Sequence, residues 1–148
     1  ETAMARMETL ELVRAYYDNF NDRDVDGMLA LLTEDVIHDV SQGGREIGRA
    51  EFASCFERMN RCYREQVIDL VIMATDGGEN AAAEFTVEGR YMETDRDHPS
   101  EIEMPEAAGQ PYRVAGRALF EIREERIARV TDWYDLPEWL RQVGKAAL

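Results

Sequence analysis

The spacing of apolar residues changes once along this chain, close to residue 62. Before that point, apolar residues recur three or four positions apart over 7–20 and 51–62, which predicts two helices. After it, runs rich in β-branched and other apolar residues predict four strands, over 64–74, 80–91, 112–123 and 126–134. This change of period predicts that helices form the first part of the chain and a sheet the second part.

Three shorter elements are predicted between and after these segments. Asp22 or Asp24 caps a short helix that runs through Leu32. A strand over 36–40 follows it and ends at a glycine-containing turn, and a closing helix over 136–143 starts with a proline in its first turn.

Helices that precede a run of strands are typical of an α+β domain, in which the helices cover one face of a mostly antiparallel sheet. We expect a single domain over 4–148 and leave residues 1–3, which precede a methionine, out of the prediction. A strongly curved sheet of this kind leaves a cone-shaped pocket between sheet and helices. The acidic segment 92–111 is predicted to be a long loop, either closing over the pocket mouth or disordered.

The charge of the chain excludes several classes of partner. Seventeen basic residues against 31 acidic ones give a formal net charge of −14, and a single lysine is present. Such a surface repels phosphate, so we expect neither nucleic acid nor a membrane surface as a partner. No apolar run approaches the roughly 18 residues of a membrane helix, and no secretory signal is visible, which favours a cytoplasmic protein.

The two cysteines, Cys55 and Cys62, are seven positions apart on a predicted helix and its exit. This spacing fits two reduced thiols better than a disulfide framework. Neither cysteine has a histidine nearby in the sequence at a spacing typical of metal sites, so we expect no metal and no organic cofactor.

One predicted strand carries ionisable residues in an apolar setting. His38 and Asp39 stand among Val36, Ile37 and Val40. A histidine and a carboxylate on a hydrophobic strand are suited to acid/base chemistry shielded from water. The alternative is a hydrogen-bonded core histidine without a catalytic role.

Several runs resemble the superfamily of ketosteroid isomerases and SnoaL-like polyketide cyclases. They are residues 16–21, 24–36 and 127–135, with Gly48-Arg49 between them. Residues 42–46 and 60–66 are more narrowly similar to bacterial ketosteroid isomerase-related proteins. The resemblance covers nearly the whole chain. It implies the nuclear-transport-factor-like (cystatin-like) cone fold, and a homodimer that buries the outer face of the sheet.

Only one of the three catalytic residues of ketosteroid isomerases has a counterpart in this sequence. Ketosteroid isomerases use a tyrosine of the first helix as oxyanion donor, a first-strand aspartate as base and a second, protonated aspartate. The tyrosine matches Tyr16, but the base position falls on Val40 and the second aspartate near Ala118. Asp39 is one residue off and so points to the opposite face of the strand. We therefore do not expect a true steroid Δ-isomerase.

Because the isomerase base position is occupied by Val40, His38 and Asp132 are the candidates for the acid/base group. His38 lies two residues before the vacant base position, so it shares that face and is expected to point into the cone. Asp132 is the best match to the late-strand acid/base aspartate that the resemblance to SnoaL-like cyclases implies, and apolar surroundings would raise its pKa. The alternative for Asp132 is an ion pair with Arg113, Arg117 or Arg129.

These residues support two hypotheses. The first is cofactor-independent proton transfer, of the isomerase or aldol-cyclase type, on an apolar carbonyl compound, with His38 or Asp132 as base and Tyr16 as hydrogen-bond donor. The second is a module that binds a hydrophobic small molecule without turning it over. They differ in whether the three side chains converge within about 4 Å. The residues expected to line the pocket are Val40, Phe56, Phe85, Phe120 and Tyr134.

Overall fold

The computed structural model describes residues 2–41, 43–100 and 102–146 of the 148-residue chain. Its elements are α1 (Thr2–Asn21), α2 (Val25–Leu29), β1 (Leu32–Val40), β2 (Arg45–Ile47), α3 (Arg49–Cys62), β3 (Tyr63–Ala74), β4 (Asn80–Tyr91), β5 (Gln110–Arg123), β6 (Arg126–Tyr134) and α4 (Leu136–Ala146). The six strands form one sheet in the order β2-β1-β6-β5-β4-β3. Within the part of the chain that the structure describes, β1 and β6 are the only parallel pair, and the other neighbours are antiparallel. The predicted α+β class is therefore confirmed.

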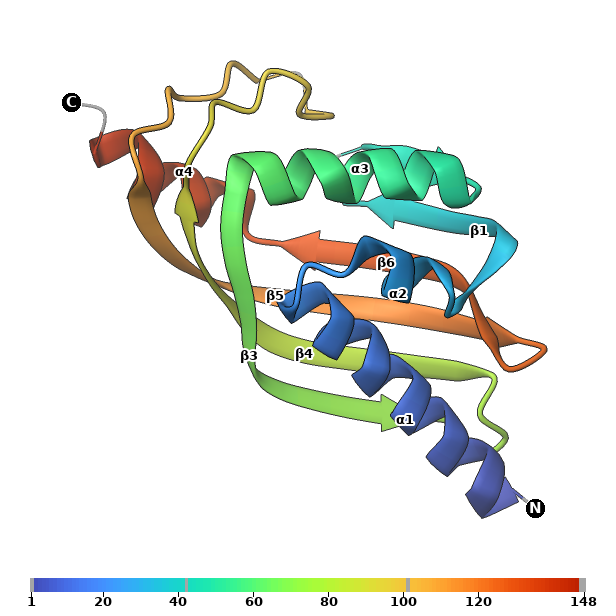
Figure 1. The fold of residues 1–148 in the computed structure, drawn as a ribbon. Helices are drawn as coiled ribbons and strands as arrows, with labels where there is room; N and C mark the ends of the chain where they lie inside the picture. The colour runs from blue at the N-terminus through green and yellow to red at the C-terminus, as the bar shows by residue number, and fades with distance from the viewer. Residues whose placement is uncertain (1, 42, 101, 147–148) are drawn as a thin grey trace.

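Helices α1, α2 and α3 lie on one side of the sheet, while α4 closes one end of it (Figure 1). The sheet curves toward these helices, most visibly in β3. The register of β3 against β4 shifts between Ile68 and Val71, and Asp69 in that interval has a positive φ of 54°. Such a bulge bends a strand and increases its twist, so it gives the sheet the curvature that opens a cavity under α1 and α3.

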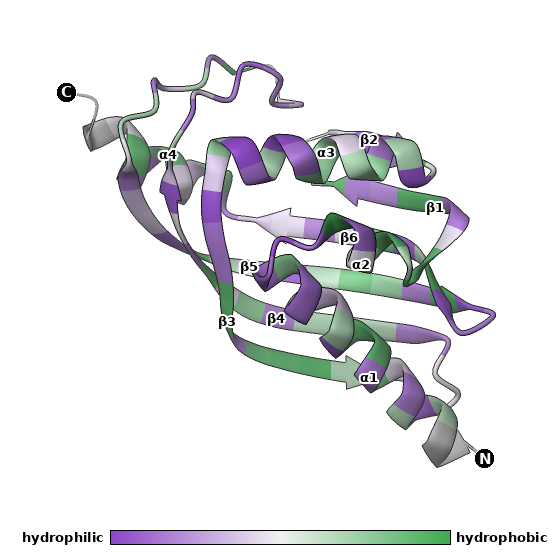
Figure 2. Cartoon of the chain, in the orientation of Figure 1, coloured by the Kyte–Doolittle hydropathy of each residue, from purple (hydrophilic) through white to green (hydrophobic). Residues whose placement is uncertain are grey.

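The core has two parts. The larger fills the space between α1, α3 and the middle of the sheet, around fully buried Val13, Phe52 and Phe120. The smaller lies under α4, where Trp139 packs against Tyr91 and Tyr112. Hydrophobic and hydrophilic residues alternate along α1 in Figure 2, as expected for a helix that buries one face.

Most predicted elements are present, with two corrections near the first strand. The short helix ends at Leu29 rather than at Leu32, and β1 starts at Leu32 instead of 36. Leu32 is fully buried and pairs with Ile127 of β6, so a tertiary contact overrides the local helical pattern. The sequence prediction also lacked β2, whose three residues are too short to show an alternation.

Within the described ranges, no helix has both the length and the apolar character needed to cross a bilayer.

Candidate active site

A cavity of about 770 Å³ lies beside the larger core, where the concave sheet meets α3, the C-terminal end of α1 and Trp139 of α4. Most of its wall surface is apolar and aromatic, which is typical of small-molecule sites. Several glutamates, two aspartates, two arginines and both histidines also line it. The segment 92–109 also contributes to the wall, through Asp97, His98, Pro99 and Met104. Three of the predicted pocket residues from the sheet (Val40, Phe85 and Tyr134) and one from α3 (Phe56) line it.

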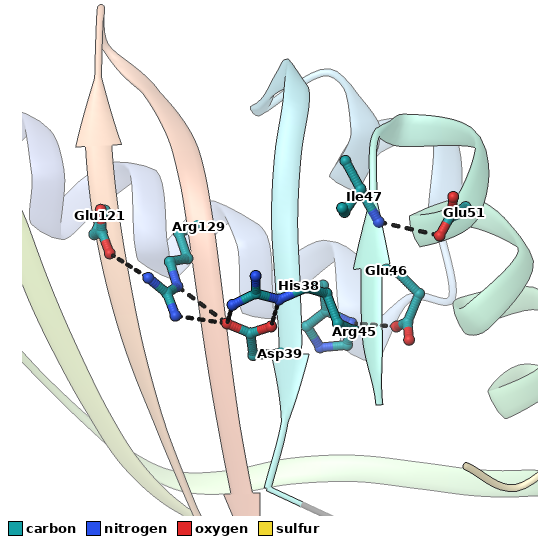
Figure 3. A network of polar contacts seen from close by, with 8 residues as sticks. All are labelled: His38, Asp39, Arg45, Glu46, Ile47, Glu51, Glu121 and Arg129. Atoms are coloured by element: carbon teal, nitrogen blue, oxygen red, sulfur yellow. Dashed lines mark hydrogen bonds and ion pairs between the residues drawn. The ribbon is translucent and has the colours of Figure 1, made fainter. Parts of the chain in front are cut away.

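His38 stands at the centre of the ionisable groups and is 2% exposed. Its Nδ1 lies 2.8 Å from Oε1 of Glu46, and its Nε2 lies 2.6 Å from Oδ2 of Asp132. The first of these contacts is drawn in Figure 3. Both ring nitrogens of the imidazole are therefore held by carboxylates.

Strand pairing explains why these three residues meet. On one side of β1, His38 is directly opposite Glu46 of β2. On the other side, β1 pairs in parallel with β6, where His38 is opposite Val130 and Val40 is opposite Asp132. Because Asp132 is two residues from Val130, its side chain lies on the same face of the sheet as that of His38. Asp39 points to the other face, where it accepts from Arg45 and Arg129 (Figure 3).

The two carboxylates decide the charge of His38. Burial alone lowers the pKa of an imidazole, but the hydrogen bonds to Asp132, Cys55 and Glu46 outweigh it and raise the pKa of His38 well above its usual value. For Glu46, burial raises the pKa, but the hydrogen bond to His38 opposes it and the net shift is downward. The two carboxylates therefore favour the imidazolium form of His38, which can donate to both of them.

Two phenols of α1 face the same carboxylate. Tyr16 lines the cavity, is 2% exposed and packs edge-on against Tyr17 and Phe120, with ring centroids 5.2 and 5.5 Å apart. Burial, and then the charge of Asp132, raise the pKa of both tyrosines well above its usual value, so each keeps its proton. Among the described residues, the Tyr17 hydroxyl has no hydrogen-bond partner, although it lines the cavity.

Tyr16, His38 and Asp132 all line the cavity, with Tyr16 on α1 and the other two on the sheet. His38 and Asp132 are in direct contact. Phe120 is the exception among the predicted residues, because it does not line the cavity. It is 1% exposed and lies in the core behind Tyr16 and Tyr17, where its ring supports both phenols. The arginine pairing considered for Asp132 is also absent from the described contacts: Arg129 binds Asp39 and Glu121, and Arg113 binds Glu88.

Other ionisable residues of the cavity wall were missed at the sequence level. Glu65 of β3 accepts from the Tyr112 hydroxyl at 2.6 Å, and burial raises its pKa against the effect of that hydrogen bond. His98 lies 2.8 Å from the Tyr134 hydroxyl through its Nε2. These contacts give the cavity polar groups outside the His38 cluster.

The segment 92–109 is fixed to the cavity wall by one buried carboxylate. Asp95 is 1% exposed and accepts from Arg58 of α3 and from the Tyr63 hydroxyl of β3. Its backbone N–H donates to the hydroxyl of Tyr91. The described residues of this segment, 92–100 and 102–109, are therefore part of the site.

Comparisons with known proteins agree with the fold and the sequence. The family model described as a SnoaL-like domain matches residues 13–130. A "putative polyketide cyclase" from Xanthomonas campestris is 48% identical, covers 93% of this chain and 98% of its own, and superposes with a TM-score of 0.85. One from Pseudomonas putida is 49% identical, with coverages of 91% and 97% and a TM-score of 0.85. No curated protein matches this chain.

A more distant structure confirms the predicted architecture. An NTF2-like protein from Burkholderia xenovorans is 15% identical, covers 93% of this chain and 97% of its own, and has a TM-score of 0.72. At this identity the likeness shows the fold alone. The chain belongs to the SnoaL-like family and has the nuclear-transport-factor-like (NTF2-like) fold.

Proposed function

We propose that this protein catalyses proton transfer on an apolar carbonyl compound, of the aldol-cyclase or isomerase type, with Asp132 as the base. The observation that carries the proposal is the buried His38 held between Asp132 and Glu46 on the wall of an apolar cavity. Relatives named as polyketide cyclases support it, because such a cyclisation begins by removing a proton next to a carbonyl.

The charges of the site assign the roles. His38 is an imidazolium at neutral pH and so cannot itself accept a proton. The Asp132 carboxylate can, and its side chain is 29% exposed, which leaves an oxygen accessible from the cavity. His38 fixes that carboxylate by its Nε2–H bond and balances its charge. Glu46 holds the other side of the ring, so His38 is a positioning residue.

The steps of the reaction follow from these roles. Asp132 takes a proton from the carbon next to the carbonyl, and the electron pair of that C–H bond moves onto the carbonyl oxygen. Tyr16, whose phenol stays protonated, donates a hydrogen bond to the resulting enolate. In an isomerase, Asp132 returns the proton to another carbon. In an aldol cyclase, the enolate carbon attacks a second carbonyl of the same molecule, and the alkoxide formed takes the proton back.

The second candidate is a module that binds a hydrophobic molecule without reaction. One observation favours it: both nitrogens of His38 are already engaged by carboxylates, as in a histidine that serves only the fold. Addition of water to an epoxide requires an Asp-Arg-Asp arrangement, and here the partner of Asp132 is His38. The contacts of Asp132 therefore do not favour that reaction.

Hydrogen–deuterium exchange into a model ketone distinguishes catalysis from binding. A bicyclic apolar ketone such as 2-tetralone is incubated with the protein in D₂O, and loss of the C–H signals next to the carbonyl is followed by NMR. The wild type should accelerate exchange, and Asp132→Asn should lower that acceleration by about 10²–10⁴-fold. Tyr16→Phe should lower it less, and Glu121→Gln, on the exposed face of β5, should leave it unchanged.

Two results would overturn the catalytic proposal. One is binding of ketones, seen as shifts in the protein spectrum, without faster exchange in any of a panel of apolar ketones and diketones. The other is an acceleration that Asp132→Asn retains. The first result would establish the binding module instead.

A further inference from the structure

We propose that His38, Glu46 and Cys55 form a binding site for a divalent transition metal of the zinc class. One ligand atom from each residue (a ring nitrogen, a carboxylate oxygen and the thiol sulfur) lies within 4.8 Å of the other two. The three come from β1, β2 and α3, so the tertiary fold brings them together. No metal was expected from the sequence, in which His38 and Cys55 are too far apart to form a recognisable motif.

The donor set is selective for one class of ion. Imidazole nitrogen, thiolate sulfur and a carboxylate oxygen are the ligands of Zn²⁺, whereas Mg²⁺ and Ca²⁺ take oxygen alone. With bonds of about 2.0–2.3 Å, the edges of a tetrahedral zinc site measure roughly 3.3–3.8 Å. The distances between the three ligand atoms lie on both sides of that range. His38 Nδ1 and Glu46 Oε1 are 2.8 Å apart, and no two of the ligand atoms are more than 4.8 Å apart. Binding therefore requires movements of about 1 Å or less, within reach of side-chain rotation.

The surroundings of the cluster match those of metal-binding histidines. If Nδ1 of His38 is the ligand, its Nε2–H still donates to Asp132 at 2.6 Å. A histidine ligand almost always donates its other ring N–H to a carboxylate, a backbone carbonyl or a water, which fixes its tautomer and orientation. His38 is 2% exposed and Cys55 9% exposed, so the donors are held in place and shielded from bulk water.

The charges around the cluster can accommodate a divalent ion. A thiolate from Cys55 and the Glu46 carboxylate together cancel its two positive charges. Arg58 of α3 also interacts with Cys55 and Glu46, but its own charge is compensated by the buried Asp95. A bound cation would therefore replace the proton that His38 now carries on Nδ1.

A metal ion bound by His38, Glu46 and Cys55 would have its fourth coordination position directed at the cavity. His38, Glu46 and Cys55 all line the cavity. Three protein ligands with a fourth position facing a cavity are the arrangement of catalytic zinc sites, in contrast to the closed four-ligand sites of structural zinc. The fourth position would receive water or the carbonyl oxygen of a ligand. This inference goes beyond the proposed function and does not rest on it, since Asp132 stays outside the ligand set.

Cobalt titration tests the site directly. Protein freed of metal by a chelator is titrated with Co²⁺ under reducing conditions, and its absorption spectrum is recorded. The chain has two cysteines, so the variant Cys62→Ser leaves Cys55 as the only thiol. We expect this variant and the wild type to show a thiolate-to-cobalt charge-transfer band and the intense visible bands of tetrahedral cobalt, both abolished by Zn²⁺.

Matched variants assign the ligands. Cys55→Ser should lose the charge-transfer band. Glu46→Gln should bind cobalt more weakly, and Asp132→Asn should lower the affinity by about 10–100-fold, as expected for a residue behind a ligand. Circular dichroism checks that each variant is folded. Absence of the band in both wild type and Cys62→Ser at millimolar Co²⁺ would overturn the proposal, as would an equal band in Cys55→Ser. If Cys55→Ser does not fold, the Cys62→Ser spectrum decides alone.

Discussion

The Nε2 of His38 lies 2.6 Å from Oδ2 of Asp132, across the only parallel pair of strands among the described residues. The two residues are 94 positions apart in the chain. Because β1 and β6 run in the same direction side by side, the contact depends on the register of that pair. The same geometry links the stability of the sheet to the charge of the site.

Replacing Asp132 should destabilise the fold. In Asp132→Asn, the buried His38 loses one of its two charged partners, and we expect the free energy of unfolding to fall by about 1–3 kcal/mol. Chemical denaturation measures it. Glu121→Gln, which removes only a long surface ion pair with Arg129, should change it by less than about 0.5 kcal/mol. Equal losses in the two variants would contradict the account.

The pH dependence of stability should carry the signature of His38. Its pKa in the folded protein is raised, so the stabilisation from its proton is fully present below the unfolded value of about 6.5 and is lost as the pH rises through the folded value. Glu46 acts at the acid end, where its lowered pKa makes stability fall as the pH drops through the folded value. Thermal melts across this range should show a maximum between the two.

The variant Glu46→Gln separates these two effects. It should flatten the acid limb of the stability curve and shift the alkaline loss toward lower pH, because the imidazolium keeps only Asp132 as a charged partner. An unchanged alkaline limb would show that Glu46 does not contribute to the charge of His38.

The segment 92–109 should depend on Asp95 for its order. Asp95→Ala leaves the half-buried Arg58 without its carboxylate, and we expect a loss of about 3–5 kcal/mol in stability if the guanidinium stays in place, or local opening of the segment if it does not. Amide hydrogen exchange should show faster exchange over 92–109. Asp97→Asn, at an exposed position, is the control. Unaltered protection in Asp95→Ala would contradict this role.

The outer face of the sheet should mediate a homodimer. Leu119 of β5 and Met73 of β3 are both opposite Ala82 of β4, and they are 51% and 58% exposed, so they form an apolar row across the strands. Trp133 of β6, which is opposite Arg117 of β5, is 41% exposed. Light scattering at micromolar concentration should give twice the monomer mass, and Leu119→Glu should give a monomer. A monomeric wild type would contradict the dimer.

The sequence predicted the parts of the site that depend on local pattern. The alternation along 36–40 placed His38 on one face and Asp39 on the other, and the structure has them so. Asp132 was predicted from the resemblance to SnoaL-like cyclases, which implies an acid/base aspartate on a late strand, and it does line the cavity. A period of two fixes such faces without knowledge of the partner strand.

The rest of the site depends on contacts between distant elements. Glu46 was missed because β2 has only three residues and is recognisable only by its pairing with β1. Cys55 was judged by its spacing in the sequence, which does not show that α3 passes over His38. Phe120 was expected among the aromatic residues of the pocket lining, but its ring packs against Tyr16 and Tyr17 in the core and does not reach the cavity. Local patterns do not contain this information.

The charge of His38 is the central claim of this account, and an NMR titration of the imidazole signals tests it most directly. The chain has two histidines, and burial lowers the pKa of His98. In chelator-treated protein, one histidine should therefore titrate above the usual value of about 6.5 and the other below it. The signal that titrates high should move down in Asp132→Asn. Two histidines that both titrate below 6.5 would contradict the imidazolium, and with it the assignment of Asp132 as the base.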